Sequence, residues 1–156
     1  MPEPFALGST SPRHGLPYLH PGQTQKEFFV NEALARLDAL VQPTVLDERP
    51  LPPADPQAGD AYLVAAGAQG DWQGEDGAIA VHQGTHWLFQ QPLPGASVRR
   101  LDTGQVSIYA GSPAGGWTTA SEPAEPTGGT TIDSQARAAI AALITALRHS
   151  GIFSAS

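Results

Sequence analysis

The chain contains no cysteine and little charge. Of its 156 residues 15% are charged, against about 25% in an average soluble domain. Without cysteine there are no disulfides, so stability must come from packing, and cysteine usage says nothing about the redox compartment. No apolar run reaches the roughly 18 residues of a membrane-spanning helix. Residues 1–5 lack the basic start and apolar stretch of a signal peptide, so we expect the protein to be made and to fold in a cytoplasm.

Positive charge is especially scarce. The net charge is −7, and residues 51–98 contain no Lys or Arg. A protein that binds nucleic acid needs a basic face to neutralise phosphates. An anionic membrane surface attracts basic segments for the same electrostatic reason. We therefore expect neither nucleic acid nor membrane among the partners.

Glycine and proline are abundant, with 17 and 15 copies, which favours a turn-rich β domain over a helical bundle. Residues 44–120 contain three similar units, each a glycine, a β-prone run, a glycine-containing turn and then Trp72, Trp87 or Trp117. These units predict three β-hairpins in a small meander. Ile79 and Val81 alternate with smaller or polar residues, which predicts an antiparallel sheet with one buried face.

An amphipathic helix is predicted over residues 24–41, before the helix-stopping Pro43. Val30, Leu34, Leu37 and Val41 follow a 4-3-4 spacing, and we expect this apolar stripe to pack on the domain core. The predicted fold class is α+β, with this helix packed on the antiparallel meander, followed by a linker and a C-terminal helix. The predicted segments are an extended arm (1–22), the helix-plus-meander domain (23–120), a linker (121–131) and the C-terminal helix (132–150).

The extended arm contains five prolines and allows two interpretations. Each proline removes a backbone donor and biases its predecessor toward extended geometry. One interpretation is a disordered tail. The other is an arm that lies on a neighbouring subunit.

The second helix, predicted over residues 133–149, has an N-cap in Asp133 and a C-terminal glycine in Gly151. Its apolar residues have the spacing of a coiled-coil seam: Ala136, Ile140, Leu143 and Leu147. An isolated helix of this length is marginal in water, so the stripe needs a partner. Copies of itself in a symmetric trimer or pentamer and its own sheet both remain open as that partner.

Catalytic signatures are missing. His82 and His86 are the only closely spaced histidines, and they lack a third ligand at metal spacing. Asp71, Glu75 and Asp76 lie near glycines, which is more typical of solvated turns than of paired catalytic carboxylates or a Ca²⁺ loop. No nucleophile elbow, phosphate loop or dinucleotide fingerprint occurs. We expect no enzyme, no cofactor and no metal.

Aromatic side chains are the remaining candidates for a binding site. Trp72, Trp87, Trp117 and Tyr109 offer flat apolar rings with polar edges, which suit stacking against sugars. The alternative is that at least two of the three tryptophans belong to the core. A carbohydrate-binding module that recognises cell-surface polysaccharide is therefore a second functional hypothesis.

Several blocks of the sequence resemble, in order, a family of domains of unknown function in alphaproteobacterial phages and gene transfer agents. The blocks are residues 23–27, 31–34, 36–42, 59–64, 70–74, 79–80, 84–87 and 131–143. The resemblance implies a structural, capsid-associated protein on the virion surface, in a head spike or fibre, without catalytic residues. Its implied partners are further copies of itself and other capsid or fibre subunits. Because the sequence ends soon after the last helix, we expect a base or adaptor that holds another fibre protein and supports host attachment.

Overall fold

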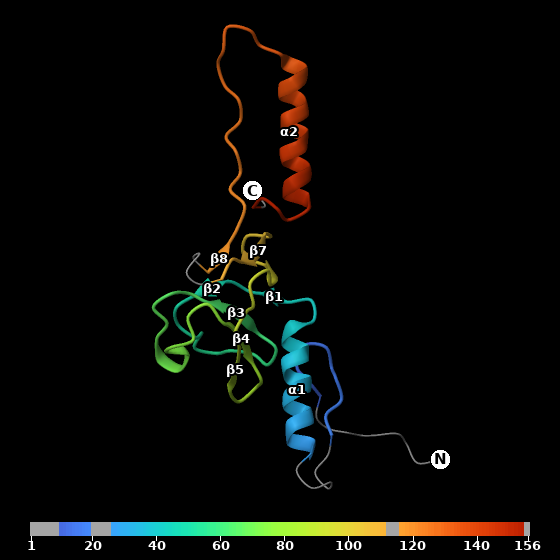
Figure 1. Ribbon diagram of the computed structural model, residues 1–156, viewed down its shortest axis with the longest axis vertical. Coiled ribbons are helices and arrows are strands. Elements are labelled where there is room, and N and C mark those ends of the chain that lie inside the picture. Colours follow the sequence, from blue (N-terminus) through green and yellow to red (C-terminus); the bar gives the residue numbers. More distant parts are fainter. Residues whose placement is uncertain (1–9, 20–25, 112–115, 155–156) are drawn as a thin grey trace, which may run out of the picture. The chain divides into compact units, whose positions relative to one another are not determined.

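The computed structural model describes residues 10–19, 26–111 and 116–154. The chain divides into two compact units, Met1–Pro92 and Leu93–Ser156. This boundary falls inside residues 23–120, the range that we predicted as one domain. The fold is α+β with two helices, as predicted, but the strands form two small sheets in place of one meander (Figure 1).

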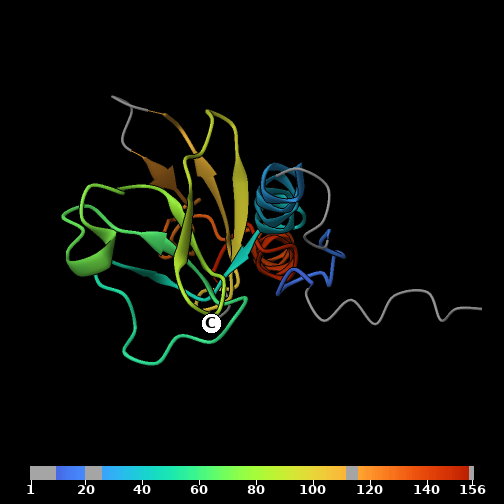
Figure 2. The same ribbon diagram turned by 90° about the horizontal axis from the view of Figure 1, so that it is seen from below.

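The first helix, α1 (Lys26–Leu40), lies within the predicted range of 24–41 and contacts β5 (Trp87–Gln90) (Figure 2). Gln42, just beyond the helix, has a φ of 46°, a left-handed conformation that is uncommon outside glycine. Pro43 follows and cannot continue a helix, because its ring clashes with the preceding turn. The predicted end of the helix is therefore confirmed.

The predicted buried face of α1 is wrong. Ala35, Asp38 and Ala39 are buried, whereas Val30, Leu37 and Val41 are exposed. Leu34, the other member of the predicted stripe, is half-buried. The helix has therefore turned its small residues and one carboxylate inward and left large apolar side chains in solvent.

The carboxylate of Asp38 explains this orientation. Its Oδ1 accepts hydrogen bonds from Ser11 Oγ at 2.7 Å and from the His14 amide at 2.7 Å, and its Oδ2 accepts one from the Arg13 amide at 3.0 Å. Asp38 is fully buried, and a buried charge is tolerated only when hydrogen bonds replace its lost hydration. The turn of residues 11–14 supplies those bonds, so Asp38 has to face it.

Residues 10–19 lie along α1 of the same chain. Arg13 donates from its guanidinium to the carbonyls of Asp38 and Ala39, at 3.3 and 3.1 Å, in the last turn of the helix, where carbonyls lack helical partners. Asn31 makes two hydrogen bonds with the backbone of Leu19, at 2.7 and 3.0 Å. This part of the predicted arm is thus a folded turn on its own helix, while residues 1–9 and 20–22 lie outside the described residues.

The sheet of the first unit has the order β2-β3-β4-β5. Its strands are β2 (Glu48–Arg49), β3 (Ala61–Val64), β4 (Ile79–His82) and β5, and a further short strand, β1 (Thr44–Val45), precedes it. The pairs β3–β4 and β4–β5 are antiparallel, and β2 runs parallel to β3. The predicted hairpin whose second strand begins at Trp87 is therefore confirmed, whereas the parallel pair was not predicted.

Both faces of the central strands are buried, contrary to the predicted single buried face. All four residues of β3 and all four of β4 are buried. Trp72 is the reason, because it lies in a short 3₁₀ helix, Gly70–Trp72, and packs with Tyr62 and Ala80. The first predicted hairpin is therefore wrong at Trp72, which covers the sheet and does not begin a strand.

The second unit contains β6 (Ser97–Arg100), β7 (Val106–Tyr109) and β8 (Trp117–Thr118), joined in antiparallel pairs. Trp117 begins β8, as the third predicted hairpin requires. The second helix, α2 (Ser134–His149), follows a long connection and agrees with the predicted range within one residue.

Replacing Asp38 with alanine tests the role of its carboxylate. The change leaves Ser11 Oγ and two amides without their acceptor, so we expect a loss of roughly 2–4 kcal/mol of unfolding free energy. Urea denaturation measures the loss, and hydrogen exchange of the Arg13 and His14 amides should accelerate. Glu32→Ala, which removes the exposed Glu32–Arg36 pair of the same helix, is the control and should cost about 0.5 kcal/mol or less. Equal effects of the two changes would contradict this assignment.

Candidate functional site

The helix α2 has well-defined ends. Oδ1 of Asp133 accepts hydrogen bonds from the amides of Gln135 and Ala136, at 3.0 and 2.9 Å, as an N-cap does. At the other end Gly151 has a φ of 77°, the left-handed conformation that commonly closes a helix. Both ends agree with the sequence prediction.

The residues after α2 return to the sheet of the second unit. The Val106 amide donates to the Gly151 carbonyl at 2.7 Å, and Gln105 Nε2 donates to the Ile152 carbonyl at 3.2 Å. Phe153 is buried. A strand-like contact therefore anchors the C-terminal end of α2 at the start of β7.

The connection between β8 and α2 runs beside the helix. Arg148, in the last helical turn, donates to Glu122 at 2.8 Å, and Arg137, near the first turn, donates to the carbonyl of Gly128. Ile144 is the buried residue of α2, and it lies on the side of the helix that carries both arginines. Residues 119–149 thus leave the sheet and return as one elongated excursion (Figure 1).

The predicted oligomerisation stripe is largely in solvent. Leu143 is 59% exposed and Ile140 is 42% exposed. Ala136 is exposed as well, while Leu147 is half-buried. The sequence left the chain's own sheet open as the alternative partner of this stripe. Within the second unit, that sheet leaves most of the stripe uncovered.

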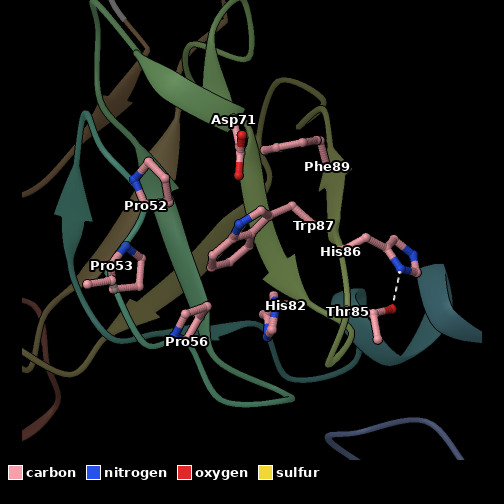
Figure 3. A pocket seen from close by; sticks show the side chains of 10 residues that line it. Pro52, Pro53, Pro56, Asp71, His82, Thr85, His86, Trp87 and Phe89 are labelled. Carbon is pink, nitrogen blue, oxygen red and sulfur yellow. Dashed lines mark hydrogen bonds between the residues drawn. The ribbon is translucent and has the colours of Figure 1, made fainter.

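A pocket of about 500 Å³ opens in the first unit. The indole of Trp87 lies in the middle of its lining, with prolines on one side and His86 and Thr85 on the other (Figure 3). Among the described residues, the lining contains one carboxylate, Asp71, and neither Lys nor Arg. The full lining is Pro52, Pro53, Ala54, Pro56, Asp71, His82, Thr85, His86, Trp87 and Phe89.

An aromatic cluster holds Trp87 in place. Its ring lies 5.0 Å from Trp72 in an edge-to-face arrangement and 4.8 Å from the ring of His82. Tyr62 lies 6.0 Å from Trp87, and burial, followed by the charge of Asp60, raises the pKa of the Tyr62 hydroxyl. Such edge-to-face contacts stabilise a cluster beyond the area that they bury. Trp87 is therefore a rigid, half-buried ring at the wall of the pocket.

The four candidate sugar-stacking residues differ in burial and in location. Trp72 is completely buried, so its ring is unavailable as a binding platform. Trp87 is half-buried in the pocket wall. Tyr109 and Trp117 form their own pair in the second unit, with ring centroids 5.3 Å apart.

The histidines and acids singled out from the sequence lie near the same pocket or in turns. His82 and His86 both line the pocket, and Nδ1 of His82 is buried without a hydrogen-bond partner among the described residues. Asp76 accepts hydrogen bonds from the amides of Gly67 and Ala68, and Glu75 accepts one from Gln91. Within residues 10–19, 26–111 and 116–154, no three His, Asp or Glu side chains are grouped to hold a metal ion. No helix in this described part has the length and apolarity to cross a bilayer.

Two groups of residues were missed by sequence reasoning. The first is the turn around Ser11 and Arg13 with its acceptor Asp38. The one sequence feature that could have indicated it is Asp38 itself, an acid among the apolar residues at the end of α1. The second is the proline-lined pocket wall, whose signal was the run of prolines in residues 50–56. Neither set is contiguous with its partners in the sequence, so spacing alone does not join them.

Residues 30–118 match the model of a family described as "Protein of unknown function (DUF2793)". The matched span covers more than half of the chain and runs from α1 to the end of β8. The helix α2 lies beyond it. No curated protein matches the chain in sequence.

Gly151→Ala tests the anchoring of α2. An added Cβ would lie 2.9 Å from the Gly104 carbonyl and 2.7 Å from the Arg99 guanidinium, in addition to the cost of a positive φ. Gly116→Ala is the matched control, since its φ is 75° but no atom of the described residues lies within 4 Å of the added atom. We expect the control to cost about 1 kcal/mol and Gly151→Ala to cost at least about 1 kcal/mol more, by urea denaturation. Equal losses would show that the close packing at Gly151 contributes nothing.

Proposed function

This chain belongs to the DUF2793 family, and on that premise we propose that it is a non-enzymatic structural protein of a virion. In this proposal it is a head-spike or fibre base or adaptor on the surface of a phage or gene transfer agent, where it supports attachment to the host cell. The resemblance of its sequence blocks to such proteins supports the assignment. Its partners are further copies of itself and other capsid or fibre subunits.

The exposed stripe of α2 is the observation that carries this proposal. Ile140 and Leu143 are large apolar side chains in solvent on an excursion that is anchored at its base. Exposed apolar surface of this kind marks an interaction site. The 4-3-4 spacing matches a helix of the same spacing, so copies of α2 in a closed symmetric bundle bury it efficiently.

An assembly of three or five copies fits a position on a virion, where spikes and fibres follow cyclic symmetry. A bundle of α2 helices would make the base rigid, and the two β-rich units would remain available for other subunits. The low charge of the chain agrees with a scaffold that assembles through apolar contacts.

Carbohydrate binding is the second candidate function, and the pocket at Trp87 favours it. A half-buried indole beside Asp71 and His86 offers an apolar ring face together with hydrogen-bonding groups. Capsular polysaccharide on the host surface is the ligand class that we assign to it. In this case the protein itself would contact the cell.

Leu143→Asp tests the bundle. A carboxylate in the seam would be desolvated on assembly, so we expect the oligomer to dissociate to monomers by light scattering. Thr145→Asp places the same charge on the opposite side of α2 and is the control, because it should leave the assembly intact. An unmodified chain that is monomeric at high concentration, or an oligomer that Leu143→Asp leaves unchanged, would contradict the α2 seam.

Tryptophan fluorescence tests carbohydrate binding. If capsular polysaccharide enters the pocket, it should quench the emission with saturation, and Trp87→Phe should weaken the affinity at least tenfold. Trp117→Phe, which removes a tryptophan of the second unit, should retain the binding. Non-saturating quenching, or equal affinity in both variants, would exclude the pocket as a glycan site.

A further inference from the structure

The exposed side of α1 carries a second apolar seam. Val30, Leu37, Leu40 and Val41 are between 40% and 49% exposed, and Ala33 is exposed too. We define the α1 seam as Val30, Ala33, Leu37 and Leu40. Their 3-4-3 spacing is that of the a and d positions of a coiled coil, over two successive heptads. The sequence alone assigned part of this surface to the core.

The helix cannot turn to hide this seam. Burying it would require α1 to rotate, which would pull Asp38 away from Ser11 Oγ and from the amides of Arg13 and His14. Rotation would also break the hydrogen bonds between Asn31 and the backbone of Leu19. Because leaving a buried carboxylate without donors is costly, the orientation with the seam outward is locked.

We propose that the α1 seam binds the α1 seam of further copies of this chain, forming a self-association interface separate from α2. The spacing is the first argument for this occupant, because a heptad stripe fits best against another helix with the same stripe. Apolar surface exposed over more than two helical turns also exceeds the scattered single residues that are normal on a protein.

The charges around the α1 seam also favour another copy of this chain as the partner. The seam residues are uncharged, and the neighbouring Glu32 and Arg36 already pair within the helix, with Arg36 Nη2 and Glu32 Oε1 2.8 Å apart. In a symmetric contact this pair therefore brings no net charge to the edge of the seam. An anionic membrane would need basic residues beside the seam, and the chain as a whole carries a net charge of −7.

The orientation of the helices follows from the symmetry. In a cyclic assembly of three or five copies, helices gathered around the axis run parallel. This step rests on the proposed function, whereas the seam itself does not. In a parallel arrangement, equivalent a positions face each other, so residue 37 of one copy lies beside residue 37 of the next, and the same holds for residue 30.

Cysteine cross-linking provides the test, since the native chain has no cysteine. We would place a single cysteine in the seam, as Leu37→Cys or Val30→Cys, and a control outside it, as Glu32→Cys. Parallel a positions bring cysteines within disulfide reach. Under mild oxidation we expect both seam variants to form disulfide-linked dimers at least tenfold faster than the control, as measured on non-reducing gels.

Rates equal to that of Glu32→Cys would overturn the proposal, and so would cross-linking at only one of the two seam positions. Coverage of the seam by another part of the same chain, or by a different protein, would give that negative result with the purified chain. The proposals for the α1 and α2 interfaces can be disproved independently of each other. Cross-linking at residues 30 and 37 in chains with native α2 reports on α1, whereas the mass of the Leu143→Asp chain reports on α2.

Discussion

The buried carboxylate of Asp38 is the constraint on which the arrangement of the first unit depends. It accepts hydrogen bonds from Ser11 Oγ and from two amides of the turn at residues 11–14. A charged acceptor with fewer donors would not be stable in the interior. This requirement directs one side of α1 toward residues 10–19 and leaves its apolar seam in solvent, although burial of apolar area alone would favour the reverse orientation.

In the second unit, a long helix is held in place although it packs little against its own sheet. Its C-terminal end is bonded to β7 through the carbonyl of Gly151, and Phe153 just beyond it is buried. The connection that contains Glu122 runs along the side of the helix. Helices of this length gain most of their stability from packing. The anchored end and the lateral contacts therefore position α2 without covering its stripe, most of which lies in solvent.

The sheet of the first unit contributes both to the core and to the wall of the pocket. Trp72 fills the interior, while Trp87, at the start of β5, is partly in the core and partly in the pocket wall. Its sequence neighbourhood predicted the hairpin correctly, because turn glycines and β-prone runs are local signals. The pocket was not predictable, because prolines from residues 52–56 meet Trp87 only through the successive pairing of β2 with β3, β3 with β4 and β4 with β5.

By itself the sequence determined the α+β class, both helices with the C-terminal end of α1 and both ends of α2, and the hairpins at Trp87 and Trp117. These features follow from periodicity, caps and turn residues, which act over a few neighbouring positions. The predicted start of α1 at residue 24 lies outside the described residues. The tertiary structure alone decided which side of α1 is buried, because that choice depends on Ser11 and Arg13, more than twenty residues from Asp38. It also decided that Trp72 is core and that Leu143 is in solvent. Apolar spacing shows that a helix has a stripe, but the stripe's partner is set by contacts that are distant in sequence.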